Sequence, residues 1–192
     1  VVTCRILVRG LRIDLDTATL TGSWRPDAEM LAELAGPSGN RASARITADT
    51  EALFLVVFVD GAGRRVLPQA GDTISVEPTG ELVDTPLTMV VPELTIAWDI
   101  DTNAVGGRAG TGGSLVFTLR DAVERGTTGP QVRRAQPDIQ ADGSYAVTFT
   151  PPLDLVPGME MVGQYRLPTG HIALRTRVTP ILLLSPFTWI ST

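Results

Sequence analysis

The sequence predicts an all-β protein: two tandem antiparallel β-sandwich domains followed by one further C-terminal strand. Short segments in which apolar and polar residues alternate recur along the chain, with Gly, Pro and Asp residues between them. A set of landmark residues also occurs twice in the same order, which indicates two copies of one unit. Hydrophobic residues make up 43% of the chain and charged residues 19%, a balance that favours a packed core over disorder.

The repeat is clearest at an acidic turn. Asp14-Leu15-Asp16-Thr17 recurs 85 positions later as Asp99-Ile100-Asp101-Thr102, and the register then holds without a gap to Leu34 and Leu119. The later landmarks keep their order with small insertions, pairing Ala48-Asp49 with Ala141-Asp142, Phe54 with Tyr145, Gly71 with Gly158, and Pro78-Thr79-Gly80 with Pro168-Thr169-Gly170. Chance does not readily produce such an ordered series, so we infer a duplicated unit.

The expected strands follow from alternation and from β-branched or aromatic content. They include residues 11–15, 19–22, 54–59, 73–76, 145–149 and 172–178. Residues 27–34 conflict with this pattern, because Asp27-Ala28-Glu29-Met30-Leu31-Ala32-Glu33-Leu34 has strong helix propensity. Their repeat partner, residues 113–119, is an apolar strand pattern, so we expect a strand in both copies.

Together, the Asp-x-Asp-Thr hairpin, the Gly after it, the Ala-Asp turn before an aromatic strand and the final Pro/Gly turns resemble the tandem immunoglobulin-like (Ig-like) β-sandwich modules of bacterial surface proteins, adhesins and filaments. The resemblance covers nearly all 192 residues. It implies about seven strands per domain, with domains at 1–80 and 81–180 and a terminal strand at 181–192. It also implies an extracellular, cell-surface location.

Charge and hydropathy exclude several partners. The net charge of −5 and the absence of any Lys argue against a nucleic-acid surface, which needs a basic face. No run of about 18 apolar residues is present, so we expect no membrane-spanning segment in this chain. Cys4 is the only cysteine and is expected to be a buried apolar side chain; with no start methionine before it, the chain is expected to be a mature or excised piece.

No catalytic set is recognisable, and we expect no enzyme activity. His171 is the only histidine and follows a turn, so an exposed position is expected. The glycine-rich stretch 106–113 lacks the context of a phosphate loop and is expected to be a flexible loop.

The repeated acidic pairs are the best metal-site candidates. Each pair places two carboxylates at alternate positions: Asp14 and Asp16 in the first copy, Asp99 and Asp101 in the second. Alternate residues of a strand share a face, so both carboxylates of a pair could bind one Ca²⁺ ion. Asp49 and Asp142 are possible additional ligands from neighbouring loops. Ordinary turn capping by Asp is the alternative interpretation. No other cofactor is indicated.

Two functions remain open from the sequence. The first is a non-enzymatic structural module of a surface filament, stalk or adhesin. The alternative is a carbohydrate-binding accessory module of a secreted enzyme, for which Trp24 is the one plausible exposed aromatic; Trp98 replaces Ile13 and is expected in the core.

The C-terminal end is the most apolar part of the chain. Its large side chains would form an exposed edge if left unpaired, which proteins normally avoid. We therefore predict that it pairs within the second unit's sheet or adds to a neighbouring chain, giving a homopolymer or a contact with another surface protein. The predicted interface residues are Ile181, Leu182, Leu183, Leu184, Phe187 and Trp189.

Overall fold

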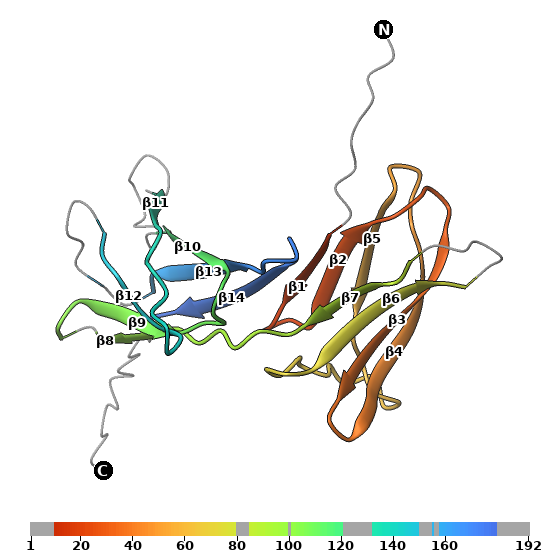
Figure 1. Cartoon of the computed structure of the whole chain (residues 1–192), viewed down its shortest axis with the longest axis horizontal. Helices are drawn as coiled ribbons and strands as arrows, with labels where there is room; N and C mark the ends of the chain where they lie inside the picture. The colour runs from red at the N-terminus through yellow and green to blue at the C-terminus, as the bar shows by residue number, and fades with distance from the viewer. Residues whose placement is uncertain are drawn as a thin grey trace, which may run out of the picture.

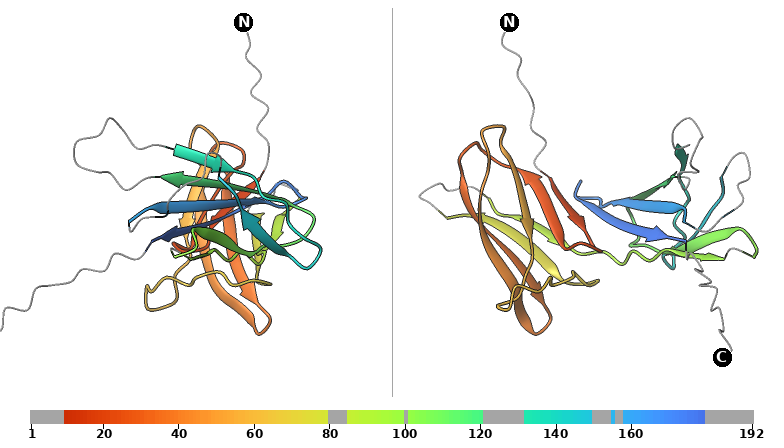
Figure 2. Two further views of the ribbon diagram at one scale, coloured as in Figure 1. Left: turned by 90° about the vertical axis from the view of Figure 1, so that its left-hand side faces the viewer. Right: turned by 180° about the vertical axis from the view of Figure 1, so that it is seen from behind.

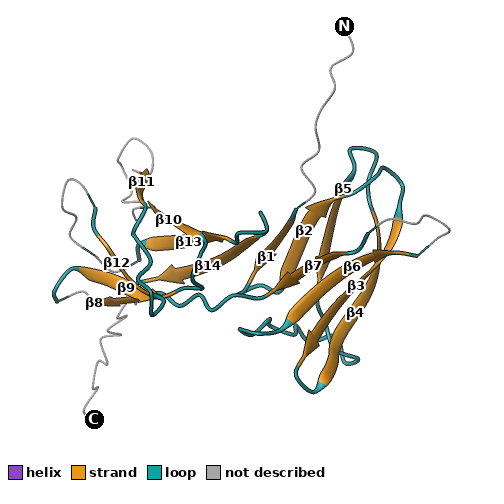
Figure 3. Ribbon diagram, in the orientation of Figure 1, coloured by secondary structure: helices purple, strands orange, loops and turns teal. Residues whose placement is uncertain are grey.

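The protein is described by a computed structural model covering residues 10–79, 85–99, 101–120, 132–149, 155 and 158–179. The described residues form strands, turns and loops and no helix, so the prediction of an all-β chain is confirmed (Figure 3). In particular, the described part contains no apolar helix of the length needed to cross a membrane.

The strands in the described part of the chain fall into two sets of seven, which we call the first unit (β1–β7) and the second unit (β8–β14). The first unit contains β1 (Leu11–Asp14), β2 (Thr19–Ser23), β3 (Glu29–Gly36), β4 (Gly39–Thr47), β5 (Leu53–Val57), β6 (Thr73–Pro78) and β7 (Leu87–Val90). The second unit contains β8 (Ala97–Asp99), β9 (Ala104–Arg108), β10 (Ser114–Arg120), β11 (Val132–Ala135), β12 (Ser144–Val147), β13 (Glu160–Arg166) and β14 (Ile172–Val178).

Both units use the same pairing order. The first unit pairs β1-β2-β5 in one group and β4-β3-β6-β7 in another; the second pairs β8-β9-β12 and β11-β10-β13-β14. All pairs inside each unit are antiparallel. The structure therefore supports the tandem repeat. The 85-residue offset also holds at the level of strands, since β2 and β9 begin and end at equivalent positions.

The segment with helix propensity is a strand, as its repeat partner predicts. β3 alternates buried and partly exposed residues, with Met30, Ala32 and Leu34 fully buried. β10 buries Leu115, Phe117 and Leu119 at the equivalent positions. Each large side chain gains roughly 1.5–3 kcal/mol on burial, which exceeds the propensity difference of about 0.7 kcal/mol per residue or less.

A glycine faces an aromatic ring across the same strand pair in both units. Gly22 of β2 lies opposite Phe54 of β5, and Gly107 of β9 lies opposite Tyr145 of β12. A Cβ atom on Gly22 would come within 2.5 Å of the Phe54 ring. The glycines therefore leave room for the rings, which explains why this landmark recurs. The predicted loop at 106–113 is partly wrong, because Gly106 and Gly107 belong to β9.

The units are joined through one sheet. β14, the last described strand of the second unit, pairs in parallel with β1, the first described strand of the first unit. The result is a continuous seven-stranded sheet in the order β11-β10-β13-β14-β1-β2-β5. Figures 1 and 2 show the two units side by side along the long axis, with β14 and β1 meeting between them.

Candidate functional site

The contact between the two units, which we call the joint, combines strand pairing, side-chain hydrogen bonds and ion pairs. Its backbone part is the parallel register of β1 on β14, in which Ile13 lies opposite Ala173 and Asp14 opposite Leu174. The Leu15 amide donates to the Leu174 carbonyl at 3.0 Å, which extends the ladder past the end of β1. Strand pairing satisfies edge groups that would otherwise be left open to other chains.

The Asp16 carboxylate accepts hydrogen bonds from β14 at the end of this ladder. Its Oδ2 accepts a 2.7 Å hydrogen bond from the Thr176 amide, and its Oδ1 accepts one of 3.2 Å from Arg177 Nη1. The Arg175 Nε atom lies 3.8 Å from Oδ1 as a second ionic partner. Exposed ion pairs contribute only about 0–1 kcal/mol each, but a backbone amide bonded to a carboxylate contributes more, because that bond is charge-assisted.

His171 secures the other end of the joint. Its Nδ1 accepts a 3.1 Å hydrogen bond from the Leu11 amide, and its ring also bonds to the backbone of Thr88 on β7. The side chain is 6% exposed, so the expectation of an exposed turn residue is wrong. Burial lowers the pKa of His171 below its usual 6.5, and the Thr88 bond offsets part of that shift.

The segment between β7 and β8 is bonded to both units. Val91 exchanges backbone bonds with the first unit, since its amide donates to the Asp72 carbonyl at 2.7 Å. Thr95 belongs to the second unit, donating to the Arg108 carbonyl at 2.8 Å, and Leu94 is buried. The connection therefore has no free stretch that would act as a hinge, in contrast to a flexible linker.

The predicted calcium ligands lie in two separate turns. Asp14 Oδ1 accepts hydrogen bonds from the amides of Asp16 and Thr17, at 2.9 and 3.0 Å. Asp99 Oδ1 accepts equivalent bonds from Asp101 and Thr102, at 3.0 and 3.3 Å. These are aspartate-capped turns of the kind that the alternative interpretation expected.

The electrostatics of the second turn follow from the same bonds. The Thr102 side chain, and then its amide, lower the pKa of Asp99 by stabilising the carboxylate. Within the described residues, no group of three or more His, Cys, Asp or Glu side chains is arranged to hold a metal ion. Calcium binding at the four aspartates stays a prediction.

Asp49 and Asp142 cap the turns before the aromatic strands. Asp49 Oδ1 accepts from the amides of Glu51 and Leu53, at 2.9 and 2.8 Å. Asp142 Oδ1 accepts from the Ser144 amide and hydroxyl, at 2.9 and 2.7 Å. The Ser144 hydroxyl, and then its amide, lower the pKa of Asp142. The Ala-Asp landmark of the repeat is therefore a turn motif.

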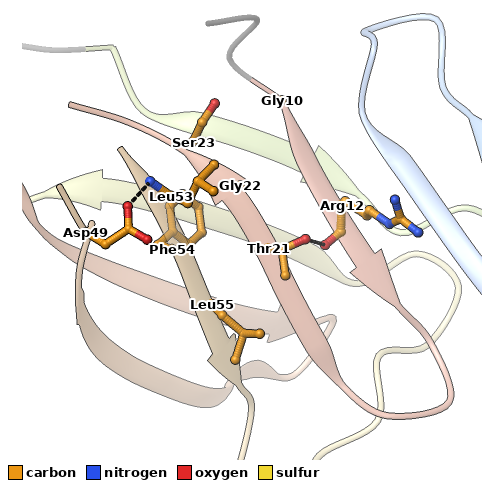
Figure 4. A pocket seen from close by; sticks show the side chains of 9 residues that line it. All are labelled: Gly10, Arg12, Thr21, Gly22, Ser23, Asp49, Leu53, Phe54 and Leu55. Atoms are coloured by element: carbon orange, nitrogen blue, oxygen red, sulfur yellow. Dashed lines mark hydrogen bonds between the residues drawn. The ribbon is translucent and has the colours of Figure 1, made fainter. Parts of the chain in front are cut away.

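A shallow open pocket of about 530 Å³ lies on the first unit near the start of β1 (Figure 4). Its ionisable side chains are Arg12 and Asp49, and the Asp49 carboxylate is already used by the Leu53 amide. No His, Cys or Glu lines it, so its lining lacks the nucleophile–base pairs of hydrolytic sites. The lining residues are Gly10, Arg12, Thr21, Gly22, Ser23, Asp49, Leu53, Phe54 and Leu55.

Two of the three tryptophans lie in the described part of the chain. Trp24 is only 2% exposed, so the expectation of a surface Trp24 is wrong. Trp98 packs against the core and is partly exposed. Cys4, Trp189 and the other predicted interface residues, Ile181, Leu182, Leu183, Leu184 and Phe187, lie outside the described residues.

The joint could not be found from the sequence alone. Asp16 and Arg177 are 161 positions apart, and no local pattern connects them. The one available signal was the alternation of Arg175 and Arg177 on a predicted strand, which places basic groups where a strand edge can meet an acidic turn.

Comparisons with known proteins give distant structural likenesses. No family model matches the chain, and no curated protein matches its sequence. One similar solved structure is a tetra-tandem repeat in the extending region of a large adhesion protein, with 18% identity, a TM-score of 0.35, and coverage of 88% of this chain and 48% of that one. Another concerns the host cell surface retention of a 1.5-MDa bacterial ice-binding adhesin, with 14% identity, a TM-score of 0.29, and coverage of 88% of this chain and 60% of that one. The chain thus spans about half of the length of the first structure.

Proposed function

We propose that this chain is a non-enzymatic, rigid two-unit segment of an extracellular surface protein of the adhesin or stalk type. The observation that carries the proposal is the joint. A seven-stranded sheet runs through both units, and the connecting segment is hydrogen-bonded on each side. Such a connection suits a protein that must hold a fixed extension, because independent domains joined by a flexible linker would bend.

Each unit is proposed to be an Ig-like sandwich domain. The support is the shared pairing of three strands in one group and four in the other, which suits an antiparallel sandwich of seven strands. We place the domain boundary in the connecting segment 91–96, later than the sequence suggested, because β7 pairs with β6 of the first unit.

The scattering of the protein in solution tests the rigid role. Small-angle X-ray scattering of the intact chain should fit one extended shape with no spread of inter-unit angles. Asp16→Ala should broaden the fitted distribution of shapes, while Asp60→Ala is the matched control, because Asp60 pairs with Arg64 inside the first unit. A flexible intact chain would contradict the proposed role.

The surface location needs its own experiment. Antibodies against the purified chain should label intact cells of the source organism without permeabilisation. Labelling that requires permeabilised cells would contradict an extracellular role, whatever the scattering result.

Assembly through residues 181–192 is a separate proposal. Its support is the run of large apolar side chains there, which need a partner strand. Deletion of 181–192 should reduce the assembled fraction measured by sizing chromatography and electron microscopy. If the shortened protein assembles as the intact protein does, strand addition by this segment is wrong.

A further inference from the structure

The joint has two complementary halves, and the second unit repeats one of them. β8 stands where β1 stands in the first unit: it is the end strand of its group and pairs only with β9 among the described strands. Asp101 stands where Asp16 stands, two residues after an aspartate whose Oδ1 accepts its amide. β8 and Asp101 therefore present the half of the joint that receives a strand.

Burial differs between β1 and the β8 side, as is expected if the β8 edge is an open binding site. Ile13 of β1 is fully buried and Leu11 is 1% exposed, with β14 alongside. Their equivalents on the β8 side, Trp98 and Ile96, are only partly buried. The Asp101 carboxylate has no hydrogen-bonding or ionic partner among the described residues, whereas that of Asp16 has three.

We propose that the β8 edge binds the last strand of a further homologous unit, parallel to β8, with two alternate arginines of that strand around Asp101. The partner's chemistry is set by the existing joint, where Arg175 and Arg177 flank the Thr176 amide beside Asp16. This inference rests on the proposed tandem role and names the partner surface that continues it.

A second copy of this chain does not supply that strand. Its β14 is already paired with its own β1. Its β7 is equivalent to β14 by pairing, but Leu87 and Met89 occupy the positions of the two arginines. The His171 ring also bonds the Thr88 backbone on β7. The partner is therefore a unit whose last strand carries the arginines and is not yet paired.

A peptide with the sequence of residues 170–179 is the probe, added to the intact chain. Alternate amides of a strand point to one edge, and the Leu11 and Leu15 amides face β14. Trp98, the equivalent of Ile13 between them, should therefore have its amide facing the peptide. At ten times Kd, binding should slow hydrogen exchange of the Trp98 amide about tenfold by linkage.

Variants on both sides make the test specific. Asp101→Ala should weaken binding about fivefold, as for a partly exposed charge pair, and a peptide with Arg175→Gln and Arg177→Gln should lose the same factor. Glu51→Ala, at an exposed turn of the first unit, is the control and should leave binding unchanged.

Three results would overturn the inference: no protection of Trp98 at peptide concentrations of about 1 mM, binding that Asp101→Ala does not weaken, or changes confined to Ile13, which would mean displacement of β14. If any of these occurs while scattering still shows a rigid pair, the docking inference fails and the proposed function stands.

Discussion

The two units share a pairing order and differ in what covers their first strand. In the first unit, β1 is covered by β14 and its apolar side chains are buried. In the second, β8 has no such neighbour in the described structure, and Trp98 stays partly exposed. The features that the fold requires, such as the shared pairing order, occur in both units. The parallel pairing with β14 that the joint adds occurs only at β1 among the described strands. Substitutions at equivalent positions can therefore distinguish the two contributions.

The largest effect is expected at the glycine that faces the aromatic ring. A Cβ on Gly107 would lie 2.2 Å from the Thr95 backbone carbonyl, whereas one on Gly22 would meet first the end of the Phe54 ring. A ring shifts more easily than backbone, so Gly107→Ala should cost about 3 kcal/mol and Gly22→Ala about 1–2 kcal/mol. Urea unfolding of the two variants measures these losses, and a larger loss for Gly22→Ala would contradict the explanation that a backbone clash costs more than a ring clash.

Asp16 of the joint and Asp101, its equivalent in the second unit, offer the next contrast. Asp16→Ala removes an acceptor from the Thr176 amide and should destabilise the chain by about 1–2 kcal/mol. Asp101→Ala removes a carboxylate without such a partner and should stay within about 0.5 kcal/mol. Thermal unfolding of both variants tests this difference; equal losses would mean that Asp16 acts only within its own turn.

Substitutions at Tyr145 and at its equivalent, Phe54, should give a smaller difference in stability. The Tyr145 hydroxyl donates to the Thr95 carbonyl, and burial raises its pKa well above the usual 10. Tyr145→Phe should cost about 1 kcal/mol through the lost hydrogen bond. Phe54→Tyr points a hydroxyl toward Gly10, the equivalent of Thr95, and should be close to neutral in denaturant unfolding; a loss above about 2 kcal/mol would show that the two ring sites are not equivalent.

Acid should loosen the joint through His171. Because its pKa is lowered in the folded protein, the unfolded chain binds the proton more tightly. The contribution of neutral His171 to the free energy of unfolding is therefore fully present above pH 6.5 and is lost as pH falls below that value. A proton on Nδ1 would also face the Leu11 amide, donor against donor.

His171→Gln should remove this pH dependence, since the chain has no other histidine. The turn aspartates Asp60, Asp99 and Asp142 have pKa values below 3.8 and act only in much stronger acid. Melting temperatures measured between pH 7.5 and 5 test this; a slope that His171→Gln leaves unchanged would contradict the assignment.

The sequence predicted the parts of the structure that local physics determines. Alternation placed β1, β6 and β14 to within a few residues, and the repeat overruled the helix propensity of 27–34. The turn function of Asp14 followed from its chemistry. Trp24 and His171 were expected to be exposed but are buried, because their burial depends on segments distant in sequence. The Trp24 amide bonds to the Ala52 carbonyl, and the His171 ring bonds to the Leu11 amide. The joint depends on such distant contacts throughout.

The most direct test of the account measures the distance between the units. Spin labels at Ser43→Cys and Ala146→Cys, both exposed and in different units, would be placed in a Cys4→Ser background. Pulsed electron–electron double resonance should give one narrow distance distribution, which Asp16→Ala with Arg177→Gln broadens. A broad distribution in the otherwise unaltered chain would contradict the claim that the joint holds the two units as one body.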